Sequence, residues 1–175
     1  ERVERATEYK LLTDISKLNA GDQIVIATKS SSKAKMLSTT ADGAHLKTTS
    51  SMTISDDSVI LPENLPSDAA VFDVEQGISA GTFALKEINN GYLYGAYDAD
   101  RTINTLSFKD KKDASASWYI SIDSKSSAAN AYAYYNNTEY RYLNNNFGSK
   151  FNFVNVLSKD SYYYIYYIDG KKSDG

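Results

Sequence analysis

An aromatic residue recurs at a constant interval in this chain, each time within a similar stretch of sequence. Phe72, Trp118 and Tyr164 are 46 residues apart, in "SDAAVFDVE", "DASASWYISID" and "KDSYYYIYYID". Such an interval is typical of folds made of repeated units, because every unit contributes the same element to the core. It therefore predicts three copies of one unit, with these three aromatics in a common core.

Short strands fill most of the chain. Apolar and polar residues alternate with period two, and turn sequences such as "NNG", "DAD", "NNT" and "NNFGS" separate the segments. We predict strands at residues 23–28, around 36, 52–55, 70–75, 82–88, 92–97, 103–108, 117–122, 131–135, 140–144, 151–155 and 162–169. Only residues 13–21 resemble a helix, of one or two turns, with Thr13 or Asp14 as N-cap and Gly21 as its end.

The same order of elements precedes each recurring aromatic: an opening strand, a second strand with a central leucine, and a third strand or turn. The leucines are Leu37, Leu93 and Leu143, at intervals of 56 and 50 residues, so the first copy has an insertion after its second strand. "SDDSVILPENLPSD", which holds both prolines, is the candidate. Three four-strand units predict an all-β fold, a β-trefoil, with a β-sandwich or another β-barrel as the alternative. Residues 1–175 then form one domain, with repeats near 21–76, 81–123 and 130–169 and a tail at 170–175.

Composition limits the chemistry that the chain can perform. It has no cysteine and one histidine, so we predict no disulfide, no zinc site and no cofactor. A net charge of −3 argues against nucleic-acid binding, and the lysines of "KDKKD" alternate with aspartates as in a solvated turn. No apolar run approaches the roughly 20 residues of a membrane span, so no membrane insertion is predicted.

Catalytic residues are not evident. His45, in "DGAHLKTT", is predicted to be an exposed loop residue, and no Gly-x-Ser-x-Gly motif accompanies it. Asp56, Asp57, Asp98 and Asp100 could form carboxylate pairs, but aspartate is also the residue that turns favour. We therefore predict a protein that is not an enzyme, and an enzyme with paired carboxylates is the weakest alternative.

Two predicted hairpins combine tyrosine with hydrogen-bonding side chains. The chain has 15 tyrosines, and a tyrosine ring can stack on a sugar while Asp and Asn bind its hydroxyls. The middle hairpin offers Tyr94, Tyr97, Asp98, Asp100, Arg101 and Asn104, and the third offers Tyr135, Asn137, Tyr140, Arg141, Asn144 and Asn145. The alternative is that these tyrosines pack across the hairpins and the asparagines adopt left-handed turn conformations.

The segment "SASWYISID" resembles the end of a ricin-B-type β-trefoil repeat, in which Gln-x-Trp closes each unit and Leu-Asp-Val opens its sugar pocket. The resemblance covers residues 21–169 and implies the fold. The family's glutamine is replaced by Ala70, Ala116 and Tyr162, and its sugar-binding aspartate by Ser38, Tyr94 and Asn144. These departures argue against galactose-type binding.

The segments "YKLLTDISKLNAGDQIVIAT", "GTFALKEINNGYLYGAY" and "SASWYISI" are similar to an uncharacterised module in large secreted or surface proteins of gut Bacteroidetes. That resemblance implies an accessory module of a larger multidomain protein, secreted or at the cell surface. We therefore predict a non-catalytic extracellular module that binds a glycan. The runner-up is a protein-interaction or inhibitor-like β-trefoil that inserts an apolar loop around Ile60 to Leu65 into its partner.

Overall fold

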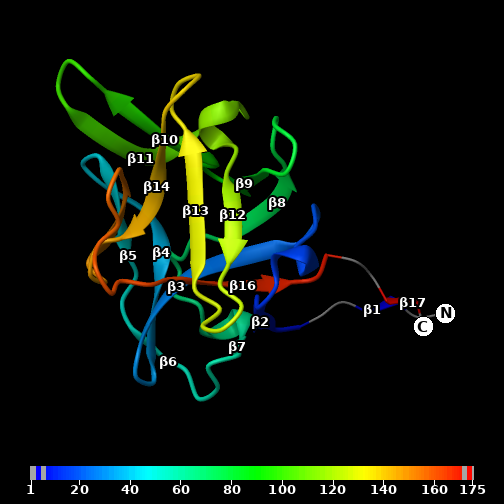
Figure 1. Ribbon diagram of the computed structural model, residues 1–175. Helices are drawn as coiled ribbons and strands as arrows, with labels where there is room; N and C mark the ends of the chain where they lie inside the picture. The colour runs from blue at the N-terminus through cyan, green and yellow to red at the C-terminus, as the bar shows by residue number, and fades with distance from the viewer. Residues whose placement is uncertain (1–2, 5–6, 171–172, 175) are drawn as a thin grey trace.

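The computed structural model describes residues 3–4, 7–170 and 173–174, and part of the predicted tail lies outside these residues (Figure 1). The described chain is almost entirely β. The strands are β1 (Val3–Glu4), β2 (Tyr9–Leu11), β3 (Gln23–Ser30), β4 (Lys33–Asp42), β5 (His45–Thr48), β6 (Met52–Thr53), β7 (Val59–Ile60), β8 (Phe72–Gln76), β9 (Phe83–Glu87), β10 (Gly91–Asp98), β11 (Ile103–Lys109), β12 (Tyr119–Ile122), β13 (Ala129–Tyr134), β14 (Tyr140–Asn145), β15 (Lys150–Val154), β16 (Tyr164–Ile168) and β17 (Ser173–Asp174). Three 3-10 turns are also present: η1 (Ile15–Lys17), η2 (Pro62–Asn64) and η3 (Ala114–Ala116). Among these residues no helix has the length and apolar character needed to span a membrane.

The region expected to be helical contains the single 3-10 turn η1. The Asp14 carboxylate accepts a hydrogen bond from the Ser16 N–H at 2.9 Å, which is the N-cap arrangement. The chain is extended again at Leu18, where the turn ends.

The longer strands all pair antiparallel. They form two groups, one joined in ladders and the other paired in three hairpins. Hydrogen-bonded ladders join β16 to β3, β3 to β8 and β8 to β9, and β12 to β13. A bridge between Phe83 and Trp118 connects the start of β9 to the residue before β12. The Ala129 N–H donates to the Tyr163 carbonyl at 2.8 Å, which sets the start of β13 beside the start of β16. The remaining long strands form the hairpins β4–β5, β10–β11 and β14–β15.

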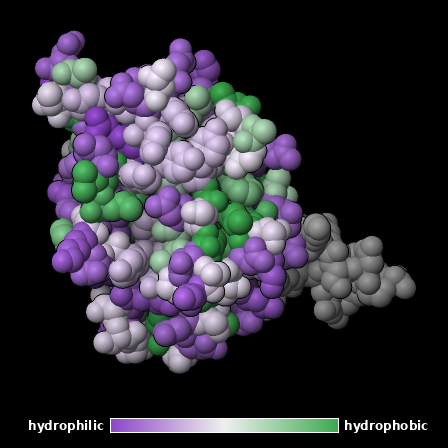
Figure 2. All heavy atoms as spheres, in the orientation of Figure 1, coloured by the Kyte–Doolittle hydropathy of each residue, from purple (hydrophilic) through white to green (hydrophobic). Residues whose placement is uncertain are grey.

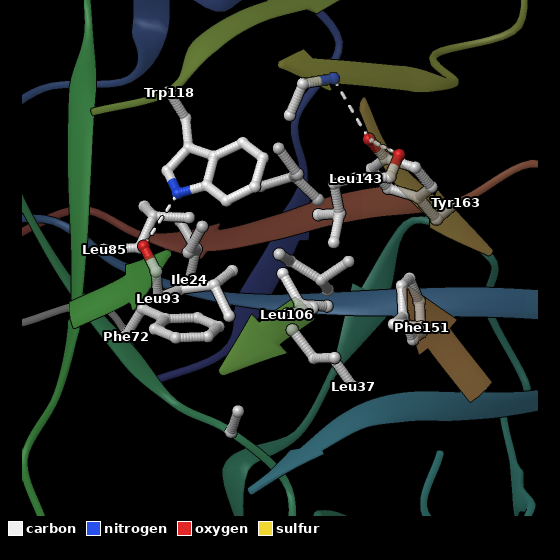
Figure 3. Packing of buried hydrophobic residues seen from close by; sticks show 14 of the residues in the cluster. Ile24, Leu37, Phe72, Leu85, Leu93, Leu106, Trp118, Leu143, Phe151 and Tyr163 are labelled. Atoms are coloured by element: carbon white, nitrogen blue, oxygen red, sulfur yellow. Dashed lines mark hydrogen bonds between the residues drawn. The ribbon is translucent and has the colours of Figure 1, made fainter. Parts of the chain in front are cut away.

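The main core lies between these strands (Figure 3). Phe72 and Trp118 are fully buried in it, as predicted, and the three recurring leucines are packed in the same cluster. The prediction for Tyr164 was wrong: this residue is half-buried outside the main core, and its neighbour Tyr163 occupies the core position. The reason is the alternation of side chains along a strand, which directs Tyr163 and Ile165 inward and Tyr164 outward.

The proline-containing segment follows β6, so it lies beyond the third strand β5 and not directly after the second strand as predicted, and it is folded against the body of the protein. β7 pairs with β2, Ile60 is buried, and the Tyr166 hydroxyl donates to the Asp57 carbonyl at 2.6 Å. Leu65 packs against a second core cluster, while Leu61 is 39% exposed. The apolar residues between Ile60 and Leu65 therefore do not form the protruding loop that the protein-interaction hypothesis required.

Candidate functional site

The two hairpins that were predicted to form separate sites meet at their ends. The rings of Tyr97 and Tyr135 pack edge to face with centroids 5.6 Å apart. The Arg141 guanidinium lies over both, with its Cζ 4.2 Å from the Tyr97 centroid and 5.2 Å from that of Tyr135. Asn104 is the cross-strand partner of Tyr97. The Asn104 Oδ1 and the Arg141 Nε are buried from solvent and have no hydrogen-bond partner.

The tip of the middle hairpin uses its charged residues to form the turn. The Asp98 Oδ1 accepts hydrogen bonds from the N–H groups of Asp100 at 3.0 Å and Arg101 at 3.2 Å. The Arg101 Nε also lies 3.7 Å from the Asp98 Oδ2. Tyr94, further along β10, has the Lys109 Nζ 4.6 Å from its ring centroid. Tyr94, Asp98, Asp100 and Arg101 therefore all have contacts within the middle hairpin.

The other candidate catalytic residues also have local roles. The Asp56 carboxylate accepts hydrogen bonds from the Ser58 hydroxyl at 2.6 Å and its N–H at 2.9 Å, and these bonds lower the pKa of Asp56. His45 is the first residue of β5 and is half-buried, so its expected place in an exposed loop was wrong. Burial first, and then the charge of Lys150, lower the pKa of His45. No group of three or more potential metal ligands occurs among the residues that the structure describes.

Tyr140 belongs to a cluster of tyrosines on the outer face of β12, β13 and β14. The cluster, called the tyrosine face below, consists of Tyr119, Tyr132, Tyr134, Tyr140 and Tyr142. Tyr119 and Tyr132 are stacked with centroids 4.9 Å apart, and Tyr140 is 43% exposed. Figure 2 shows the corresponding pale, weakly hydrophilic surface over these strands. The tyrosines occur at alternate positions, and Ala131, Ala133 and Leu143 face the core from the other side.

A hollow of about 560 Å³ lies between the β3–β4 hairpin, the β14–β15 turn and residues 160–164. Three aromatic residues line it: Phe147, which is 70% exposed, Tyr162, which is 55% exposed, and Tyr164. Polar groups come from Asn145, Asp160 and Ser161, among others. Aromatic rings beside several hydrogen-bonding groups are the arrangement that an amphipathic small ligand requires.

Two consecutive buried asparagines hold the walls of this hollow. The Asn145 Nδ2 donates to the Tyr162 carbonyl at 2.7 Å, and its Oδ1 accepts from the Gly148 N–H at 2.8 Å. The Asn144 Oδ1 accepts from the Ser158 N–H at 2.9 Å. Asn144 is 1% exposed, so the role of direct ligand contact predicted for it does not fit; its amide positions the loop that leads to Tyr162.

The backbone at the hollow has two residues in the left-handed region. Phe147 has φ 54° and Asp160 has φ 56°, a conformation that costs a bulky residue free energy. Phe147 thus presents a large apolar ring to solvent from a strained backbone. The positive φ belongs to the β14–β15 turn, and the exposed ring is the feature that favours a role in binding.

A second hollow, of about 850 Å³, adjoins the first. Ser161, Tyr162 and Tyr164 line both hollows, and the second also has Asp123 and Asn130 in its wall. Tyr162 and Tyr164 therefore lie where the two hollows meet.

Three lysines of the β3–β4 hairpin line the first hollow and were not predicted from the sequence. The Lys29 Nζ lies 4.1 Å from the centroid of the Tyr164 ring, and the Lys33 Nζ donates to the Thr53 Oγ1 at 2.9 Å. Lys35 is the third lysine that lines the first hollow. The signal was present in "TKSSSKAK", where three lysines surround a serine turn in an otherwise acidic chain.

Comparison with known proteins supports the fold. No protein-family model and no curated protein matches the chain. A solved structure described as "BEL beta-trefoil apo crystal form 3" superposes with a TM-score of 0.55 at 15% sequence identity. The match covers 89% of this chain and 99% of that one. At this identity the likeness concerns the fold, which is that of a β-trefoil.

Proposed function

We propose that this chain is a non-catalytic module that binds glycans and is built from three four-strand repeats. The strands β3, β4, β5 and β8 form the first repeat, β9 to β12 the second, and β13 to β16 the third. In each, the second and third strands make a hairpin, which supports repeats near residues 21–76, 81–123 and 130–169 of one domain.

The observation that carries the proposal is the position of Tyr162 between two hollows. Its ring is more than half exposed and has Asn145, Asp160 and Ser161 nearby as lining residues. A sugar ring presents C–H groups on its face and hydroxyls at its edge, so it can stack on the aromatic ring while its hydroxyls bind the polar groups.

The hairpin residues that were predicted from the sequence are proposed to form a second binding location. The rings of Tyr97 and Tyr135 and the Arg141 guanidinium meet at one junction, which offers a sugar an aromatic surface beside a cation. Asp98, Asp100 and Arg101 extend this area at the tip of the middle hairpin, whereas Tyr94 lies on the other face of β10, beside Lys109. Weak binding at each location is strengthened when several modules act together, as in a larger secreted or cell-surface protein.

A second candidate function, binding of a protein partner, is favoured by the tyrosine face. Tyrosine is enriched at protein interfaces because a rigid ring buries a large area and its hydroxyl still forms hydrogen bonds. Five such residues share one side of β12, β13 and β14. This function would use that sheet face and not the loop around Ile60.

The test is a glycan array screened with the purified protein and with Tyr162→Ala, Tyr97→Ala and Tyr140→Ala. We expect binding that Tyr162→Ala abolishes, because stacking requires the ring. Loss in Tyr97→Ala or Tyr140→Ala instead would move the site to the hairpin junction or the tyrosine face. An array without any binding by correctly folded protein would refute the glycan proposal and favour a protein partner.

A further inference from the structure

We propose that the glycan bound at the first hollow is acidic and carries a carboxylate or sulfate group that the three lysines recognise. This inference rests on the proposed function and concerns the chemical class of the ligand. The lining of the hollow includes Lys29, Lys33 and Lys35 and a single acidic residue, Asp160. The hollow thus has an excess of positive charge in a chain whose formal net charge is −3.

The three lysines at the hollow have no acidic partner among the described residues, so no carboxylate neutralises their ammonium groups. Elsewhere Lys109 contacts Asp113 at 2.6 Å and Lys112 contacts Glu75 at 3.0 Å. Within the described residues none of the three lysines at the hollow forms an ion pair. An acidic ligand would therefore meet ammonium groups that have no competing carboxylate to displace.

The contacts of two of these lysines limit their movement. Lys29 lies over the Tyr164 ring, so its ammonium group is held beside the aromatic lining. The Lys33 ammonium group is held by its hydrogen bond to Thr53 of β6. Partial ordering before binding reduces the side-chain entropy that a ligand must offset.

An acidic sugar fits this lining better than a neutral sugar or a nucleic acid does. A neutral sugar offers the ammonium groups only hydroxyl acceptors, whereas a carboxylate or sulfate offers charged ones. A nucleic-acid groove needs many cations along an extended path, and this hollow has three at one hairpin. Lysine also suits compact anions because its ammonium acts as a point charge with three donors.

The experiment compares charged and neutral forms of the same sugars by titration calorimetry. Tetragalacturonate is paired with its methyl ester, which keeps the sugar rings and removes the charge, and dextran sulfate is paired with dextran. The first pair tests a carboxylate and the second a sulfate. Each is titrated into the wild type and into Lys29→Gln, Lys33→Gln and Lys35→Gln. Lys111→Gln, an exposed lysine that does not line the hollow, is the matched control.

We expect one charged form to bind more tightly than its neutral partner, and each of the three variants to weaken that binding about three- to tenfold. Lys111→Gln should leave it unchanged, and added salt should weaken it. Equal affinity for a charged form and its neutral partner would overturn the acidic-ligand inference and leave the proposed function intact. An equal loss of affinity in Lys111→Gln would show that the attraction of polyanions is non-specific, and it would overturn the acidic-ligand inference. No binding of any of the four probes, together with a blank array, would refute both proposals.

Discussion

The indole Nε1 of Trp118 donates a hydrogen bond to the backbone carbonyl of Leu93 across the core, at 2.9 Å. Both residues are fully buried. Replacing Trp118 by Phe keeps an aromatic ring but removes the donor and leaves unfilled volume, so the free energy of unfolding should fall by about 2–4 kcal/mol. Denaturant titration measures this change. Tyr119→Phe, at the adjacent partly exposed position, is the control and should change it by less than about 1 kcal/mol.

Asn145 predicts a joint loss of stability and of binding. Asn145→Ala removes the two hydrogen bonds that hold the Gly148 turn and the Tyr162 carbonyl, so unfolding should become easier by about 2 kcal/mol. Glycan affinity should fall by about tenfold or more, because both aromatic walls lose their common anchor. Asn137→Ala, in an exposed turn, should change neither quantity. Unchanged affinity in Asn145→Ala would show that the hollow is not the binding site.

Buried tyrosines predict a loss of stability in alkali. Burial raises the pKa of Tyr163 well above its ordinary value, and burial followed by the charge of Asp57 raises that of Tyr166. A raised folded-state pKa means that stability is fully present below the unfolded value, about pH 10, and decreases as the pH rises above it. We expect a slope of about 1.4 kcal/mol per pH unit for each tyrosine involved. Denaturation between pH 8 and pH 11 measures it, and Tyr163→Phe should reduce the slope.

Gly95 allows a close contact inside the core. A Cβ atom at this position would overlap the ring of Phe153, which is fully buried and packs edge to face against Trp118. Gly95→Ala should therefore destabilise the protein by about 3 kcal/mol. In the control, Gly43→Ala, a Cβ meets nothing within 4 Å and only the positive φ of 61° is unfavourable, at about 1 kcal/mol. Similar thermal shifts in the two variants would contradict the packing at Phe153.

The sequence predicted most of the longer strands because turn residues and period-two alternation are local signals. It missed the short strands β2 and β7, which pair with each other and carry too few residues to show an alternation. Phe72 and Trp118 are in the core as expected. The third aromatic was assigned one residue too late, to Tyr164 in place of Tyr163. The cause lies in "YYYIYY", where tyrosine fills both inward and outward positions, so alternation does not show which face each ring takes.

The candidate site was harder to predict because its parts are distant in sequence. Lys29, Phe147 and Tyr162 come from three separate segments that meet only in the folded chain. The meeting of Tyr97 and Tyr135 is equally non-local, although each residue had been selected for its hairpin. Asn144 was selected for a polar side chain, and only the fold reveals that its amide is used internally.

Tyr162 lines both hollows, and under the proposed function this shared residue relates the occupancy of one hollow to that of the other. A short saccharide that stacks on the ring from one side changes the surface available to a second saccharide on the other, so the two binding events depend on each other. A chain long enough to fill both sides must pass over the ring. Under the proposed function, affinity for such a ligand should therefore depend on its length and should increase abruptly at the oligomer size that reaches across both hollows.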